Sequence, residues 1–292
     1  MNFRDDLRDG SKHSLTPERS PQRTAASPSN LNINYLEWKE KAIPCSRKIR
    51  GIAFNEPITK VRRAEELIQL TRKGVAFTGT QADLNSLREK YERDNYVILP
   101  QLYQPTLLEE IMLRVDAARF VPKDHDGFAL ELCMDDQVTA AMMEFFPNNP
   151  AFLRLLERIT GQPRIGEFTG RVYRMTSSGG HYDHWHTDCW DRRVVTMSVN
   201  LSRKAFAGGA LQIKHRGSGM ILCEIRNTGF GDALLFRISG DLAHRVQGVE
   251  DEIPKTAFAG WFLEGEDFLP NLRKRSNQSV RTEDQAWETL RK

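Results

Sequence analysis

The chain has 292 residues, of which 39% are hydrophobic and 28% charged, the mix of an ordinary globular protein with one large domain or two small ones. Its net charge is only +3, and the positive excess lies in residues 1–30 and 271–292, so we expect no nucleic-acid partner. No apolar run approaches the ~20 residues that cross a bilayer, which indicates no membrane partner. The four cysteines are widely spaced, which predicts a reduced, cytoplasmic protein.

The first ninety residues divide into two parts by composition. Residues 1–30 are rich in Ser, Pro, Arg and Asp and have no hydrophobic periodicity, which predicts a disordered tail. Residues 31–90 are predicted to form a helical N-terminal segment, because 64–68 and 82–91 have the apolar spacing of an amphipathic helix.

The next elements are a strand and two helices. A short β-rich run over 94–100, closed by Pro100, predicts a strand, and Pro105 marks the start of a helix. A second helix is predicted over 150–160, because Gly161 is a stop signal. The segment 120–145 shows no clear period and is expected to be a loop.

After Gly170 the chain becomes a series of short β-rich segments separated by Gly, Asp and Asn. Eight strands are predicted, at 171–175, 182–188, 194–202, 209–214, 220–226, 232–237, 242–249 and 256–264. This pattern is typical of a sandwich, jelly roll or small barrel. Helices followed by strands predict an α+β protein dominated by β structure, with a core domain over 91–268 and a charged tail over 269–292.

The chemistry-bearing residues gather near the second predicted strand. Two H-x-D patterns overlap there, one formed by His181 and Asp183 and one by His186 and Asp188. Alternate residues of a strand share a face, so His184, His186 and Asp188 are predicted on one face and the other pair on the opposite face. Either pair could supply an imidazole and a carboxylate.

A distant histidine can complete a metal site. His244 lies on a later predicted strand, and Lys255 follows it by eleven residues. Two histidines and one carboxylate leave open positions on Fe(II), which oxygen chemistry requires. An isolated H-x-D is more often a packed or exposed histidine on a strand, so the context of the whole β-domain decides.

That context resembles the Fe(II)/2-oxoglutarate-dependent dioxygenase superfamily, in its prolyl-hydroxylase and phytanoyl-CoA-hydroxylase branches. The resemblance covers about residues 90–265. The runs that carry it are Arg171–Arg174, Gly179–Gly180, Trp185–Asp188, Thr196–Leu201, Gly208–Gln212, Gly231–Phe236, His244–Val246 and Lys255–Trp261. It implies a double-stranded β-helix (jelly-roll/cupin-like) core with flanking N-terminal helices.

The resemblance also implies roles for individual residues. It selects the second H-x-D pair and makes His186, Asp188 and His244 the Fe(II) ligands. Lys255 matches the basic residue that pairs with the distal carboxylate of 2-oxoglutarate, and Tyr173 matches a tyrosine that helps to hold it.

Further candidates flank this set. Thr196 and Ser198 share one strand face and are predicted on the cofactor side, although such a face is about as often solvated. His184, Arg171 and Arg193 are candidate substrate contacts. The alternatives are a packed histidine and surface ion pairs, the commoner fate of exposed arginines.

The implied reaction consumes O₂ and 2-oxoglutarate, releases succinate and CO₂, and hydroxylates an unactivated C–H of an amino acid, peptide or small metabolite. A non-catalytic jelly-roll protein that binds a metal or ligand is the alternative, and a Zn²⁺ hydrolase at the same histidines is a third class. Intact His186, Asp188, His244 and Lys255 argue against a degenerate barrel, and a hydrolase would have no role for that lysine.

Overall fold

The computed structural model describes residues 66–226, 228–265 and 267–270, all within one compact unit, Lys60–Lys292. The predicted disordered tail 1–30 and most of the C-terminal tail lie outside the described residues, as does the helical segment up to residue 65. Within the described part, no helix is long and apolar enough to cross a membrane.

The described chain opens with a two-stranded hairpin, β1 (Ile68–Thr71) and β2 (Gly74–Phe77). The helix predicted over 64–68 is therefore wrong for residues 66–68, the part of it that the structure describes. Burial there alternates with a period of two, since Ile68 and Leu70 are buried and the residues between and after them less so. Five residues were too few to distinguish this alternation from helical spacing.

Four helices follow the hairpin or lie between strands. They are α1 (Gln81–Asp94), α2 (Pro105–Ala117), α3 (Gln137–Phe145) and α4 (Pro150–Thr160). The three helices predicted from sequence are confirmed. Thr80 and Asp83 form a capping box at the start of α1, and Gly161 ends α4 in the left-handed conformation.

The remaining strands build the β-domain. They are β3 (Tyr96–Leu99), β4 (Phe120–His125), β5 (Ala129–Met134), β6 (Glu167–Met175), β7 (Tyr182–Asp183), β8 (Arg193–Asn200), β9 (Leu211–His215), β10 (Ile221–Ile225), β11 (Ala233–Arg237), β12 (Leu242–Val246) and β13 (Lys255–Leu263). The predicted loop at 120–145 is wrong, because β4, β5 and α3 occupy it. The strand predicted over 182–188 is confined to two residues, and the chain then continues as irregular structure.

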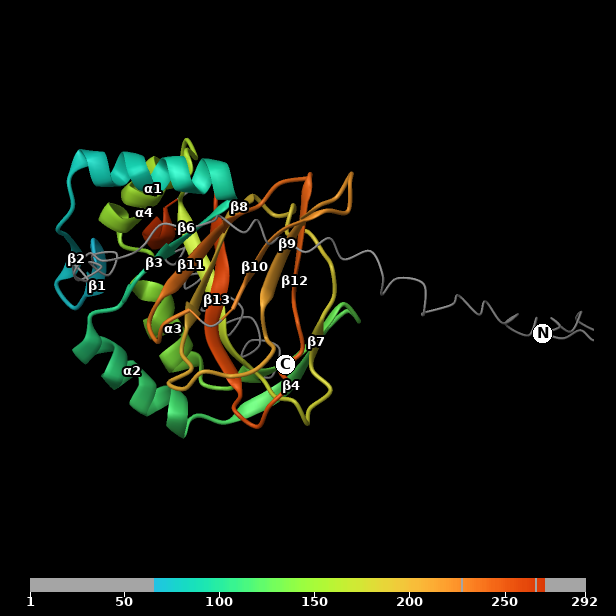
Figure 1. Ribbon diagram of the computed structural model, residues 1–292. Coiled ribbons are helices and arrows are strands. Elements are labelled where there is room, and N and C mark those ends of the chain that lie inside the picture. Colours follow the sequence, from blue (N-terminus) through green and yellow to red (C-terminus); the bar gives the residue numbers. More distant parts are fainter. Residues whose placement is uncertain (1–65, 227, 266, 271–292) are drawn as a thin grey trace, which may run out of the picture. The chain divides into compact units, whose positions relative to one another are not determined.

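The strands form two antiparallel sheets. The large sheet has the order β3-β11-β8-β13-β6-β5-β4, with β7 paired to β5, and the small sheet has the order β10-β9-β12. Figure 1 shows the helices gathered on one side of the large sheet and the small sheet on the other. The predicted β-dominated, jelly-roll type core is confirmed.

Strand β8 shows how one sequence pattern serves both sides of the large sheet. Val195, Met197 and Val199 are fully buried in the main core, which also contains residues of all four helices. The intervening residues Thr196 and Ser198 line a cavity on the opposite side. The strand therefore separates a hydrophobic layer from a polar chamber.

Phe168 is a core position whose loss we expect to be costly. It is 1% exposed, and its ring centroid lies 5.4 Å from that of Phe258 and 4.8 Å from that of Phe262. Phe168→Ala should lower the free energy of unfolding by about 3–5 kcal/mol because it leaves a cavity. Urea denaturation measures this change. The matched control is Phe145→Ala, since Phe145 is 60% exposed; equal losses in both variants would contradict the assignment.

Candidate active site

The polar chamber between the sheets is a cavity of about 530 Å³, within the usual range for small-molecule sites. Its walls come from both sheets and from the turn between β4 and β5. Backbone hydrogen bonds between His186 and His244, 3.0 and 2.9 Å long, join the segment after β7 to the small sheet. This bridge brings together residues that are far apart in the sequence.

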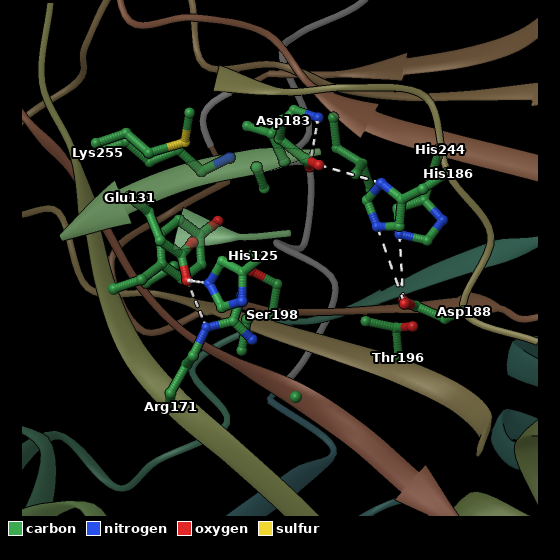
Figure 2. Close-up of a pocket in the computed structure, with 18 of the residues that line it drawn as sticks. His125, Glu131, Arg171, Asp183, His186, Asp188, Thr196, Ser198, His244 and Lys255 are labelled. Atoms are coloured by element: carbon green, nitrogen blue, oxygen red, sulfur yellow. Dashed lines mark hydrogen bonds and ion pairs between the residues drawn. The ribbon is translucent and has the colours of Figure 1, made fainter. Parts of the chain in front are cut away.

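At one side of the cavity the structure brings His186, Asp188 and His244 together. One ligand atom from each lies within 4.8 Å of the others. Figure 2 shows the two imidazoles and the carboxylate turned toward one another, with Thr196 beside them. His186 and Asp188 come from the segment after β7, and His244 comes from the middle of β12.

His186 is oriented by its Nδ1 atom. That nitrogen lies 2.7 Å from the carbonyl oxygen of His184 and 3.1 Å from Oδ1 of Asp183, so it carries the proton and donates. In the neutral ring Nε2 is then the nitrogen without a proton, and it lies 3.9 Å from Asp188. Burial opposes protonation of the ring, but Asp183 outweighs it and raises the pKa of His186. A backbone carbonyl and a carboxylate behind a histidine are the usual supports of a metal ligand.

Asp188 is buried and held from several sides. Its Oδ2 accepts a hydrogen bond of 2.7 Å from the indole nitrogen of Trp261, and its Oδ1 accepts one of 3.3 Å from Arg193. Nε2 of His244 lies 3.3 Å from Oδ2. Burial works against ionisation, yet His244 and Trp261 lower the pKa of Asp188 to about 2. The carboxylate is therefore ionised at neutral pH, as a metal ligand must be.

These residues fit Fe(II). Two imidazole nitrogens and one carboxylate on one side of a cavity match the facial ligand set of non-haem iron oxygenases, which leaves positions open for other ligands. The open side faces the chamber, and Oγ1 of Thr196 is buried there without a protein partner among the described residues.

Lys255 lies at another wall of the cavity, at the start of β13. Its ammonium donates a hydrogen bond of 2.7 Å to the carbonyl oxygen of Gly209, a residue with φ of 61° that a side chain would strain. Burial lowers the pKa of Lys255 to about 8, although Asp183 and Glu131 work against the shift. One protein acceptor leaves two of the three ammonium hydrogens for an anionic ligand.

Tyr173 and Ser198 line the same cavity. Burial raises the pKa of Tyr173, so its hydroxyl stays protonated and can donate. The structure thus places the residues predicted on the cofactor side, Tyr173, Thr196, Ser198 and Lys255, around one chamber with the metal cluster.

A buried ion-pair network forms a third part of the wall. Nε of Arg171 donates to Oε1 of Glu131, and Nε2 of His125 lies 3.0 Å from the same oxygen. Burial opposes ionisation of Glu131, but the hydrogen bond from His125 and the charge of Arg171 lower its pKa. His125, Glu131 and Cys133 also have the spacing of metal ligands, yet Arg171 already supplies the cation there.

The predicted substrate contacts are placed differently from one another. Arg171 and Arg193 both line the cavity, and the guanidinium of Arg193 lies 3.6 Å from the ring centroid of Trp261. His184 is exposed and does not line the cavity, although it stacks on Tyr182, which does. Strand parity was wrong here because β7 ends at Asp183, so alternation does not continue to His184.

The sequence did not identify four residues of the site: Asp183, Trp261, Glu131 and His125. Asp183 was placed on the face away from the metal, Trp261 was named only as the end of a motif run, and Glu131 and His125 fell in a predicted loop. The Asp183 side chain also accepts a 2.9 Å hydrogen bond from the Val246 backbone. Only the Asp-x-x-His spacing of Asp183 and His186 was available as a signal, and it is weak by itself.

Residues 170–263 match the family model described as the 2OG-Fe(II) oxygenase superfamily. The match contains the His186–Asp188–His244 cluster. It confirms the resemblance predicted from the motifs and the predicted cofactors, Fe(II) and 2-oxoglutarate. No relative among curated proteins matches the chain.

Solved structures give distant likenesses. A prolyl-4-hydroxylase from Pseudomonas putida shares 16% identity over 62% of this chain and 99% of its own, with a TM-score of 0.47. A prolyl hydroxylase from Trichoplax adhaerens, in complex with a hypoxia inducible factor peptide fragment, shares 16% sequence identity. The likeness covers 64% of this chain and 94% of that one, with a TM-score of 0.47. A 2OG-Fe(II) oxygenase family oxidoreductase from Burkholderia pseudomallei shares 15% sequence identity over 65% of this chain and 95% of its own, with a TM-score of 0.46. These values indicate nothing about what this chain acts on.

The metal-ligand assignment is tested by a pair of neighbouring residues. Asp188→Ala should weaken Fe(II) binding more than about 100-fold. Mutation of a residue that only hydrogen-bonds to a metal ligand typically lowers metal affinity about 10- to 100-fold, and loss of a ligand itself should lower it further. His184→Ala should leave Fe(II) affinity unchanged, because its side chain is exposed and only its backbone touches His186. Anaerobic equilibrium dialysis measures both. Unchanged binding in Asp188→Ala would refute the assignment.

Proposed function

We propose that this chain is a non-haem Fe(II)/2-oxoglutarate-dependent oxygenase whose metal ligands are His186, Asp188 and His244. Its substrate is an amino acid, a peptide or a small metabolite, hydroxylated at an unactivated C–H. The observation that carries the proposal is one chamber holding both the His–Asp–His cluster and the incompletely used ammonium of Lys255.

Each end of this arrangement has a distinct task. The cluster binds the metal, and Lys255, with Tyr173 and Ser198 beside it, binds the far carboxylate of 2-oxoglutarate. When both are bound, the iron supplies oxidative decarboxylation of 2-oxoglutarate to succinate and CO₂ and the oxidation of a C–H bond. The chain's own residues orient these ligands and exclude water.

Several supports keep the ligand set in one geometry. Asp183 and the His184 carbonyl hold the proton on Nδ1 of His186, and Trp261 fixes Asp188. The ring of His186 and the ionised carboxylate of Asp188 are therefore held in place before the metal arrives, so less ordering accompanies metal binding.

A non-catalytic jelly-roll binding protein is the second candidate, and product formation separates the two. Purified protein titrated anaerobically with Fe(II) and then 2-oxoglutarate should develop a weak visible charge-transfer band only when both are present, and admission of O₂ should release succinate. His186→Ala should lose the band. A band without any succinate, over a panel of amino acids and peptides, would favour the binding protein; a folded protein with no band would refute the cofactor site.

The ammonium of Lys255 predicts a pH dependence of 2-oxoglutarate affinity. Below pH 8 the group is protonated and attracts the carboxylate; above it, binding must also take up a proton. The Kd for 2-oxoglutarate should therefore rise about tenfold per pH unit above pH 8. Titration of the charge-transfer band from pH 7 to 9.5 measures this rise.

The control is Lys255→Arg, which stays charged throughout this range. Its Kd should not change with pH, whatever its absolute value. A flat wild-type profile, or the same rise in both proteins, would show that Lys255 does not bind the cosubstrate.

A further inference from the structure

The cavity has a wall that the proposed function leaves unused. 2-Oxoglutarate bound between the metal cluster and Lys255 does not account for Arg171, which lies on β6 beside Glu131 and Trp261. Figure 2 shows the Glu131–Arg171–His125 group apart from the metal ligands, facing the same chamber. The inference below rests on the proposed function and concerns the substrate of the same site.

The guanidinium of Arg171 is fixed in place but only partly hydrogen-bonded. Its Nε donates to Glu131, and its Cζ lies 5.9 Å from the ring centroid of Tyr173 and 5.5 Å from that of Trp261. Among the residues that the structure describes, the terminal nitrogens of Arg171 have no hydrogen-bond acceptor. The side chain is 31% exposed, and it lines the cavity. Its open edge thus offers donors to a ligand.

Glu131 acts as the anchor of this arginine. Its Oε1 is shared by Arg171, by Nε2 of His125 and by Sγ of Cys133 at 3.5 Å. The contacts of His125 and Cys133 with the same oxygen fix the position of the Glu131 carboxylate. Arg171 is therefore oriented by its Nε while the planar end of the guanidinium remains free.

The neighbouring residues define the shape of what fits. Trp261 contacts both Arg171 and the metal ligand Asp188, so a group bound at Arg171 lies close to the metal cluster. Phe128 and Trp190 add aromatic surface to the cavity lining. A compact molecule with an anionic end and an apolar body fits this surface.

We propose that the open edge of Arg171 binds a carboxylate of the substrate. The two terminal nitrogens of a guanidinium match the two oxygens of a carboxylate in one plane. A dianionic phosphate is less suited, because Glu131 and Asp188 lie near the same arginine. The substrate class is thus a small carboxylic acid, free amino acids included, and Arg171 selects it.

The test first separates this proposal from the proposed function. Wild type and Arg171→Gln are titrated anaerobically with Fe(II) and 2-oxoglutarate. Both should give the charge-transfer band with the same Kd for 2-oxoglutarate, because Lys255 holds that cosubstrate. No band in the wild type would overturn both proposals. A band lost only in Arg171→Gln would overturn this one, because Arg171 would then serve the cosubstrate.

The second step uses acid and amide pairs as probes. The twenty L-amino acids and straight-chain carboxylic acids of three to eight carbons are each compared with the corresponding primary amide, by tryptophan fluorescence of the Fe(II)/2-oxoglutarate complex without O₂. At least one acid should bind at least tenfold more tightly than its amide. Arg171→Gln should reduce the affinity for that acid about 10- to 100-fold, the loss of charged hydrogen bonds, and leave the affinity for the amide unchanged.

Two further variants keep the result interpretable. Arg174→Gln is the matched control, since Arg174 lies on the same strand, outside the cavity lining, and bonds to Thr256; it should retain the acid preference. Glu131→Gln/Arg171→Gln removes both charges and avoids an unpaired buried carboxylate; it should lose the preference while remaining folded by circular dichroism. Equal binding of every acid and its amide, including no binding of either, would overturn the proposal, as would an acid preference that persists in the double variant.

Discussion

The site depends on the two-sided character of the strands in the large sheet. Side chains of alternating residues point to opposite faces, so β8 can place Val195, Met197 and Val199 in the core while Thr196 and Ser198 face the chamber. The helices cover the apolar face, and the small sheet stands opposite the polar one. The polar wall is therefore built without removing residues from the hydrophobic core, and the chamber persists because the core beneath it is complete.

Charge distribution in the chamber follows from this separation. Three carboxylates of the cavity lining have partners in the protein: Glu131 pairs with Arg171, Asp183 with His186 and the Val246 backbone, and Asp188 with Trp261 and Arg193. By contrast, Lys255 gives only one hydrogen bond to the described protein, and Arg171 keeps its terminal nitrogens open. These carboxylates are paired with donors of the protein itself while the two cations keep hydrogens to give, so the chamber favours anions at two separate places.

Sequence reasoning reached the fold class and the site's centre. Helices with caps and short strands between turn residues are readable from neighbouring residues, whereas the choice of His186, Asp188 and His244 came from the resemblance of the whole β-domain. It failed where tertiary pairing decides. The segment containing Glu131 became two strands because it pairs with β6 and β7, and β7 ended at Asp183 although the residue pattern continued. Parity placed Asp183 away from the metal ligands and His184 beside them, whereas in the structure Asp183 contacts His186 and His184 is exposed.

Lys255 and Arg171, the two cations with unused hydrogen-bond donors, differ in how their charge depends on pH. Lys255 is a compact ammonium without a carboxylate in contact, so burial lowers its pKa to about 8 and makes its charge sensitive to mildly alkaline conditions. Arg171 is paired with Glu131, which outweighs burial and raises its pKa further, so its charge does not vary. Under the two proposals, a rise in pH therefore weakens cosubstrate binding at Lys255 and leaves carboxylate binding at Arg171 intact. If the chamber binds two carboxylates as proposed, a lysine and an arginine in different surroundings keep the two binding events chemically distinct.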